Sequence, residues 1–175
     1  MEFMEVILKN LDIPSKIATV IIATCNLFLT VKFFNFKNTK DNIDKENDRR
    51  IQWLKSLILD HNLKHFYEFF DNLNIELNKL KQSGLSNDDK ENIDSEIADK
   101  FIILRQKFID IILAVDSNLY FLFITLSDEL QAHITDSVFD DGINLSNSTK
   151  FDEVIQNKVT QIKTEFIKNL FSYRG

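Results

Sequence analysis

The stretch IATVIIATCNLFLTV, residues 17–31, is the longest part of the chain without a charged residue, and it decides what kind of fold the sequence encodes. Its fifteen residues rise only about 22 Å as an α-helix, less than the roughly 30 Å hydrocarbon core of a bilayer. The flanking Lys16 and Lys32 can extend their ammonium groups along the helix toward water. Counted from Ile13 to Phe36, the segment has 24 residues, enough to cross a bilayer with some tilt.

A buried core helix and a cleaved signal peptide are the two other interpretations of this segment. The signal peptide is disfavoured because three acidic residues precede the apolar run and no small-x-small cleavage site follows it. The core helix stays open as an alternative. We predict a tail over residues 1–12, a single transmembrane helix over residues 13–36 and a helical domain over residues 37–175.

The lysines around the segment predict its orientation. Lys32, Lys37 and Lys40 follow the apolar run before the first acidic residue, Asp41, whereas the short N-terminal side carries two lysines. Because basic flanks tend to stay in the cytoplasm, we expect the N-terminus outside and the helical domain inside the cell.

Polar residues within the segment gather on one side of the expected helix. At 100° per residue, Ser15, Thr19, Asn26 and Thr30 fall within about 60° of one another, with Ala23 at the edge of this sector. An asparagine in hydrocarbon is costly unless it meets another helix or water. Threonine hydroxyls have the alternative of bonding to their own helix. We therefore predict that these five residues line a pore or a helix interface between several copies of the chain.

The remainder of the chain reads as helical. Three glycines and one proline leave few sites for tight hairpins, and apolar residues recur at helical spacing, so the fold class is all-α. The expected helices run from about residue 41 to 80 with Gly84 as the stop, from Ser86 or Asn87 to about 115, over 116–139, and from about Thr149, with Asp152 completing a capping box, to the terminus. These predict a cytoplasmic four-helix bundle. The polar stretch that joins it to the span is either a connector or the start of a long helix.

The most apolar part of the domain is Leu119–Leu126, with Thr125 as its polar interruption. Eight residues are too few to cross a bilayer. We expect this stretch to be either the innermost helix of the core or a subunit interface.

Charge and cysteine content narrow the function classes. The formal net charge of −6 lies beyond Phe36, so the domain repels phosphate backbones and we expect no direct nucleic-acid partner. The single cysteine, Cys25, allows no intrachain disulfide.

Residues for catalysis or metal binding are sparse. HNLKH places His61 and His65 at i and i+4, but it lacks the glutamate of the zinc protease motif, and we expect no metal and no cofactor. No arginine is followed by histidine at the four- to six-residue spacing of HEPN ribonucleases. Arg105 with His133, or Arg50 with His61, could still meet in space. We expect no catalytic residues and no enzymatic activity.

The layout of tail, polar-striped span at residues 13–36 and acidic helical domain resembles the small membrane accessory proteins encoded beside the RNA-guided RNase of type VI-B CRISPR systems. The resemblance covers the whole chain. It implies a ring-like homo-oligomer in the bacterial inner membrane that strengthens antiphage defence by permeabilising or depolarising that membrane. It also implies a functional link to the RNA-guided RNase. The diverged HEPN motif proposed for that family is missing here.

The sequence thus favours an oligomeric, pore-like membrane effector. Two alternatives remain open, a membrane-anchored helical module that recruits a partner and a HEPN-like RNase.

Overall fold

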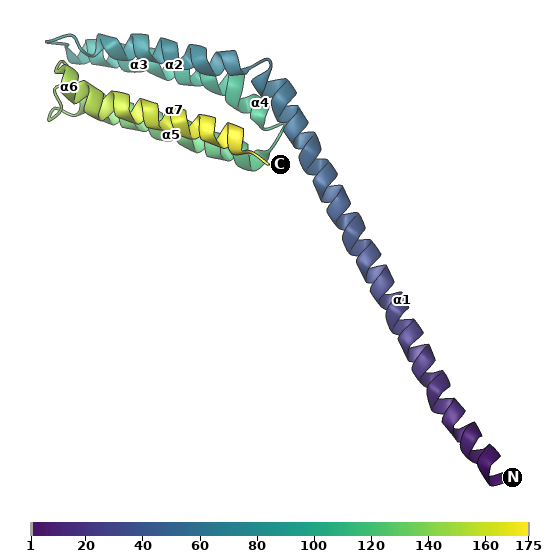
Figure 1. The fold of residues 1–175 in the computed structure, drawn as a ribbon. Helices are drawn as coiled ribbons and strands as arrows, with labels where there is room; N and C mark the ends of the chain where they lie inside the picture. Colours follow the sequence, from purple (N-terminus) through teal and green to yellow (C-terminus); the bar gives the residue numbers. More distant parts are fainter. Residues whose placement is uncertain (1, 175) are drawn as a thin grey trace. The chain divides into compact units, whose positions relative to one another are not determined.

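In a computed structural model, the backbone is described for residues 2–174 and the side chains for residues 26–174 apart from residue 38. Every regular element in this part of the chain is helical, which confirms the all-α class (Figure 1). The chain forms two compact units, Met1–Glu46 and Asn47–Gly175.

The first unit is a single helix. Helix α1 (Glu2–Trp53) runs through it and continues into the second unit without interruption. The polar stretch after Phe36 contains no glycine or proline, so nothing in it breaks the backbone ladder. Of the two interpretations of this stretch, the start of a long helix is confirmed.

The helix that begins with α1 ends earlier than predicted. It passes into the π-helical segment η1 (Leu54–Leu59) and stops before α2 (Leu63–Lys79). The single helix expected over residues 41–80 is therefore wrong.

Local hydrogen bonds explain the break. The backbone N–H of Asp60 donates to the carbonyl of Lys55 at 2.9 Å, and the side-chain amide of Asn62 donates to a carbonyl of η1. Ile58 before the turn and Phe66 after it are both completely buried. The hydrophobic spacing therefore continues across the turn, and periodicity alone does not reveal it.

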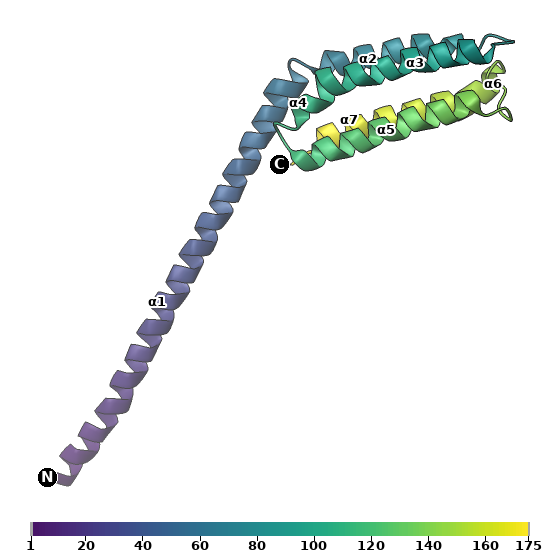
Figure 2. The ribbon, with the colours of Figure 1, turned by 180° about the vertical axis from the view of Figure 1, so that it is seen from behind.

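The second unit is an antiparallel four-helix bundle. Its first rod is α2. The second rod consists of α3 (Asn87–Leu104), η2 (Arg105–Ile109) and α4 (Asp110–Ile112), and the third is α5 (Ser117–Phe139). The fourth rod consists of α6 (Ser148–Phe151), η3 (Asp152–Gln156) and α7 (Asn157–Ser172). Figures 1 and 2 show α2 beside α3 in one layer and α5 beside α7 in the other. The predicted bundle architecture is confirmed, although its first rod starts at Leu63.

Caps at the rod ends follow the sequence signals closely, with one exception. Ser86 forms a capping box with Asp89, and Gly84 adopts φ 76°, which a glycine does without strain. The last rod begins one residue before Thr149, and its cap is Asn147, whose side chain accepts from the Lys150 N–H at 3.1 Å. The capping role predicted for Asp152 is wrong, because that residue already lies inside the helix.

Each rod contacts two neighbours, so the four form a closed square. One contact identifies each adjacent pair: Phe69 of α2 with Phe101 of α3 at 5.1 Å between ring centroids, Asp94 of α3 with Thr135 of α5 at 2.7 Å, His133 of α5 with Val154 of η3 at 2.8 Å, and Gln156 of η3 with Asn74 of α2 at 3.2 Å. The order around the bundle is therefore α2, α3, α5, α7.

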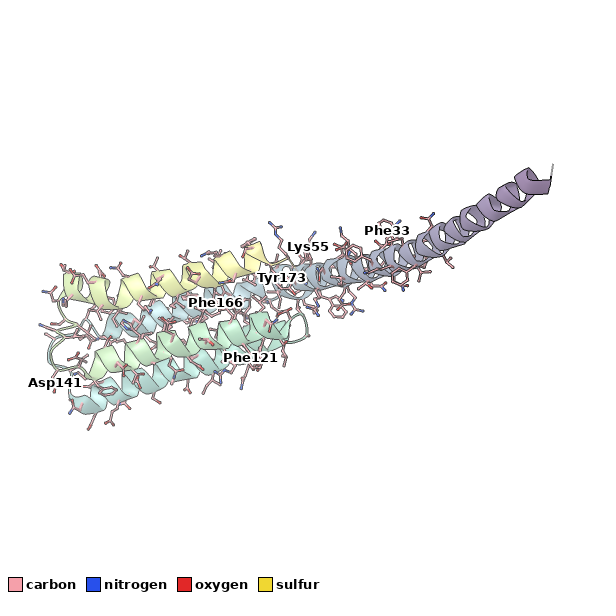
Figure 3. The ribbon with its side chains drawn as sticks, turned by 90° about the horizontal axis from the view of Figure 1, so that it is seen from below. Phe33, Lys55, Phe121, Asp141, Phe166 and Tyr173 are labelled. Carbon is pink, nitrogen blue, oxygen red and sulfur yellow. The ribbon has the colours of Figure 1, made fainter. Side chains whose placement is uncertain are left out.

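Phenylalanines fill the centre of this square. Phe166, labelled in Figure 3, is buried in the bundle. Its ring centroid lies 4.6 Å from that of Phe123 and 5.7 Å from that of Phe66, and both of these rings are buried as well. The edge-to-face contact of Phe166 with Phe123 adds to the stabilisation that comes from burial itself.

Candidate functional site

A run of exposed apolar side chains on α1 is the least expected surface of the described chain. Between residues 27 and 36, seven large apolar side chains are each at least 52 % exposed: Leu27, Phe28, Leu29, Val31, Phe33, Phe34 and Phe36. Soluble proteins rarely leave such a contiguous apolar surface uncovered.

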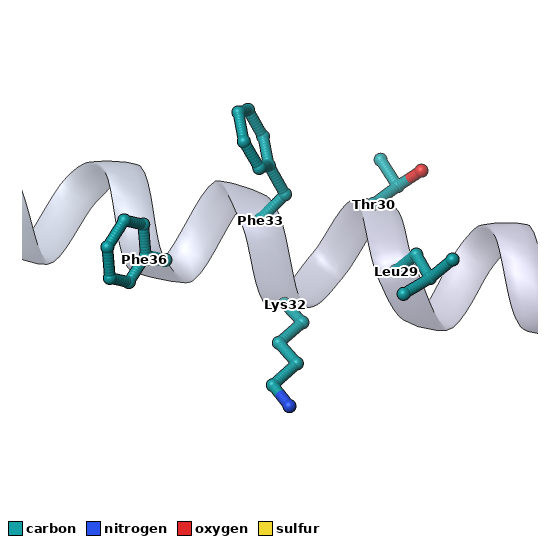
Figure 4. A pocket seen from close by; sticks show the side chains of 5 residues that line it. All are labelled: Leu29, Thr30, Lys32, Phe33 and Phe36. Carbon is teal, nitrogen blue, oxygen red and sulfur yellow. The ribbon is translucent and has the colours of Figure 1, made fainter.

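These side chains surround the helix. At 100° per residue, Leu27, Val31 and Phe34 lie on one side, and Leu29, Phe33 and Phe36 lie on the opposite side. In Figure 4 the side chains of Phe33 and Thr30 point to one side of the helix and that of Lys32 points to the other. A helix that is apolar all round is typically buried in a membrane or within a helical assembly.

The predicted polar stripe is described in part. The side chains of Ser15, Thr19 and Ala23 lie outside the described residues, whereas Asn26 and Thr30 are exposed and lie one turn apart on the same side of α1. The Thr30 hydroxyl donates to the Asn26 carbonyl at 2.8 Å. Its proton is therefore used within the helix, and its oxygen keeps acceptor capacity toward a neighbour. The stripe as a whole stays a prediction.

Among the residues whose side chains the structure describes, no helix is long and apolar enough to cross a membrane. The part of the predicted span before Asn26 lies outside those residues. The transmembrane helix over residues 13–36 therefore also stays a prediction.

The two arginine–histidine pairs considered for RNA cleavage have separate partners in the bundle. Arg105 forms an ion pair with Asp128 at 2.8 Å, whereas the ring Nε2 of His133 bonds to the carbonyl of Val154 at 2.8 Å. Since a carbonyl only accepts, Nε2 carries the proton and His133 serves the π-helical turn of η3. The structure does not bring Arg105 and His133 together.

Arg50 and His61, the second pair, are likewise not brought together, and the histidines of the HNLKH motif form no metal site among the described residues. Arg50 bonds to Asp116, and His61 lies in the turn after η1. His65 pairs with Glu68 at 2.9 Å through its Nδ1. The described residues contain no group of three or more histidine, cysteine, aspartate or glutamate side chains that could hold a metal ion.

Asp116 forms a polar cluster that the sequence interpretation missed. Its Oδ1 accepts the backbone N–H of Leu119 at 2.9 Å, which caps α5, and its Oδ2 accepts from Arg50 at 3.0 Å and from the Tyr173 hydroxyl at 3.2 Å. Burial and the nearby Asp116 carboxylate raise the pKa of Tyr173 above its usual value. This cluster ties the end of α1 to the start of α5 and to the C-terminal segment. An aspartate directly before a helix signals a cap, but its two other partners are distant in sequence.

The stretch Leu119–Leu126 is buried only in part. Leu119 and Phe123 are buried in the core, whereas Phe121 is 61 % exposed and Leu122 is 38 % exposed. Part of this stretch therefore stabilises the bundle core, and its role as a subunit interface stays a prediction. Comparisons with known proteins identify no relative of the chain: no family model, curated protein or solved structure matches it.

Proposed function

We propose that the protein is an oligomeric, pore-like membrane effector whose α1 segment crosses the bilayer and whose helical domain lies in the cytoplasm. The observation that carries this proposal is the apolar surface between Leu27 and Phe36, which faces every direction around a single helix. Each such side chain gains about 1.5–3 kcal/mol on leaving water for apolar surroundings. Lipid and neighbouring helices around α1 would remove all seven of these apolar side chains from water.

Several copies are needed because one helix encloses nothing. In the proposed assembly Ser15, Thr19, Ala23, Asn26 and Thr30 face the shared axis. Phe33, seven residues after Asn26, lies on this same side, and the apolar residues on the other sides of α1 contact lipid and adjacent copies. The exposed positions of Asn26 and Thr30 on the same side of the helix support this arrangement. The proposal assigns the chain no catalytic step, cofactor or metal.

The biological setting follows the resemblance to the accessory proteins of type VI-B CRISPR systems. There the assembly resides in the bacterial inner membrane and enhances RNA-guided antiphage defence by permeabilising or depolarising the membrane. The RNA-guided RNase is then a functional partner that recognises viral RNA, while this chain acts on the bilayer.

Ion leakage from vesicles tests the pore. The full chain, reconstituted into liposomes loaded with a potassium-sensitive dye, is expected to release ions, and Asn26→Leu is expected to reduce the leak rate at least tenfold while insertion is unchanged. The matched control is Asn35→Leu, which makes the same chemical change on the opposite side of α1. Equal leakage from the parent and Asn26→Leu would contradict the assignment of Asn26 to the pore.

A membrane-anchored binding module is the second candidate, and the exposed half of Leu119–Leu126 favours it as a docking surface. Replacing residues 13–36 with an unrelated single-pass anchor separates the two functions. The pore requires that leakage and protection against phage are both lost, whereas a tether retains full protection.

A further inference from the structure

Two opposite faces of the bundle carry different chemistry. Because the rods follow the order α2, α3, α5, α7, the outer face formed by α3 and α5 lies across the core from the outer face formed by α7 and α2. We call them the α3/α5 face and the α7/α2 face. In an isologous dimer a patch meets its own copy, whereas two distinct complementary patches on opposite faces bind head to tail.

The α3/α5 face is acidic and grooved. Its groove is lined by Phe101, Ile102, Arg105, Gln106, Asp110, Ser127, Asp128 and Gln131. Asp94 contacts α5 from this side, and the exposed Glu91 lies three residues before Asp94, one turn along the same side of α3. Glu91, Asp94, Asp110 and Asp128 supply four negative charges against the one positive charge of Arg105, so the face has a formal charge of −3.

The α7/α2 face is mildly basic. Lys163 of α7 extends over the rings of Tyr67 and Phe70 of α2, at 5.4 and 5.1 Å from their centroids. Lys64 lies three residues before Tyr67 and is exposed. Lys81, Asp71 and Asp152 share this face by helical spacing. The formal charge is therefore +3 − 2 = +1.

Each face also presents one exposed phenylalanine at the same end of the bundle. Phe121 lies seven residues before Asp128, and Phe171 lies eight residues after Lys163; they are 61 % and 62 % exposed. The hydrogen bond from the Tyr173 hydroxyl to Asp116 holds the end of α7 beside the start of α5. Figure 3 shows Phe121 and Tyr173 toward this end, away from Asp141.

We propose that the α3/α5 face of one copy binds the α7/α2 face of the next copy, with parallel bundles and with Phe121 packed near Phe171 of the neighbour. This inference rests on the proposed function: the head-to-tail contact closes into the ring that a pore requires when each copy is rotated about the pore axis relative to the one before it. A face two helices wide and 25 residues long covers roughly 800 Å², the usual size of one side of a specific interface. Opposite charge fixes the orientation, and the phenylalanines supply the apolar centre.

Disulfide crosslinking tests the head-to-tail geometry in the full chain. In a Cys25→Ala background, the double variant Phe121→Cys/Phe171→Cys is expected to form a ladder of crosslinked species in detergent after mild oxidation. Either single variant should remain uncrosslinked, because each places cysteine on one side of the contact only. Dimers from a single variant would overturn the proposal by showing an isologous contact.

Charge exchange tests the same contact independently. Lys64→Glu and Asp110→Lys are each expected to raise the concentration at which the assembly dissociates about tenfold, since each places like charges across the contact. The double variant restores opposite charges and should return to within about threefold of the parent. Lys168→Glu, on a different side of α7, is the matched control and should leave assembly unchanged.

The mass of the detergent-solubilised parent separates the two levels of the proposal. If the unmodified protein assembles and leaks ions, but the cysteine variant forms no ladder and the double charge variant shows no rescue, the assigned faces are wrong and the pore proposal stands. A monomeric parent overturns the pore as well. Circular dichroism of each variant verifies that the bundle is folded.

Discussion

Phenylalanine plays opposite roles in the two units of this protein. In the bundle, Phe66, Phe70 and Phe108 are completely buried, whereas Phe33 and Phe36 on α1 are 71 % and 69 % exposed. The residue type is the same, and what differs is whether other residues of the chain cover the ring. The bundle rods bury one another's apolar faces, whereas the described apolar side chains of α1 between residues 27 and 36 are exposed. Buried rings stabilise the bundle from within the chain, whereas in the proposed assembly the rings of α1 are covered by lipid and by other copies.

The largest expected effect comes from removing a ring from the centre of the bundle. Phe166→Ala should lower the free energy of unfolding by about 3–5 kcal/mol, because it leaves a cavity among Phe66 and Phe123. Phe33→Ala, the matched change on the exposed segment, should alter bundle stability by less than about 0.5 kcal/mol. Urea unfolding of the full chain in detergent, followed by near-ultraviolet circular dichroism, measures both. Equal losses from the two variants would break the comparison between the units.

A second effect concerns the residue that ties α1 to the bundle. Asp116→Ala removes the cap of α5 and leaves Arg50 and Tyr173 without their shared acceptor, so the free energy of unfolding should fall by about 2–3 kcal/mol. Asp116→Asn retains the cap and should lose about half as much. Amide hydrogen exchange should also become faster in residues 47–59. Unchanged exchange there would mean that Asp116 does not hold the end of α1.

The smallest effect is a pH dependence at Tyr173. Tyr173→Phe should cost about 1 kcal/mol at neutral pH through the lost hydrogen bond to Asp116. Because the folded state raises the pKa of this phenol, its contribution is fully present below about pH 10 and is lost as the pH rises through the higher folded value. Parent and variant should therefore converge in stability above pH 10. A constant difference between their urea midpoints across this range would contradict the prediction.

Local signals predicted much of the bundle. Ser86 with an acidic residue three positions later, and Gly84 before it, mark a helix start and a stop that depend on neighbours within a few residues. The all-helical class follows from the same kind of signal, because apolar spacing and the scarcity of glycine and proline act over single turns. The break at Asp60–Asn62 escaped prediction because Ile58 and Phe66 are buried on both sides of it.

The candidate site divides in a similar way. The apolar run could be located from residue type alone, and the angular positions of Asn26 and Thr30 follow from helical geometry. The Asp116 cluster could not be assembled from sequence, because Arg50 and Tyr173 lie 66 and 57 residues away from it in the chain. The separation of Arg105 from His133 likewise depends on which neighbouring rod each side chain meets.

The sequence by itself determined that this protein is helical, where most of its bundle helices begin, and that residues 17–31 are its apolar extreme, because helix formation and hydropathy depend on near neighbours. Only the tertiary structure decided which apolar residues remain exposed. It buries Phe123 and leaves Phe121 outside, although they are two positions apart. It also places the acidic α3/α5 face opposite the mildly basic α7/α2 face, because the order of the four rods around the square decides which helix surfaces are buried and which are exposed together.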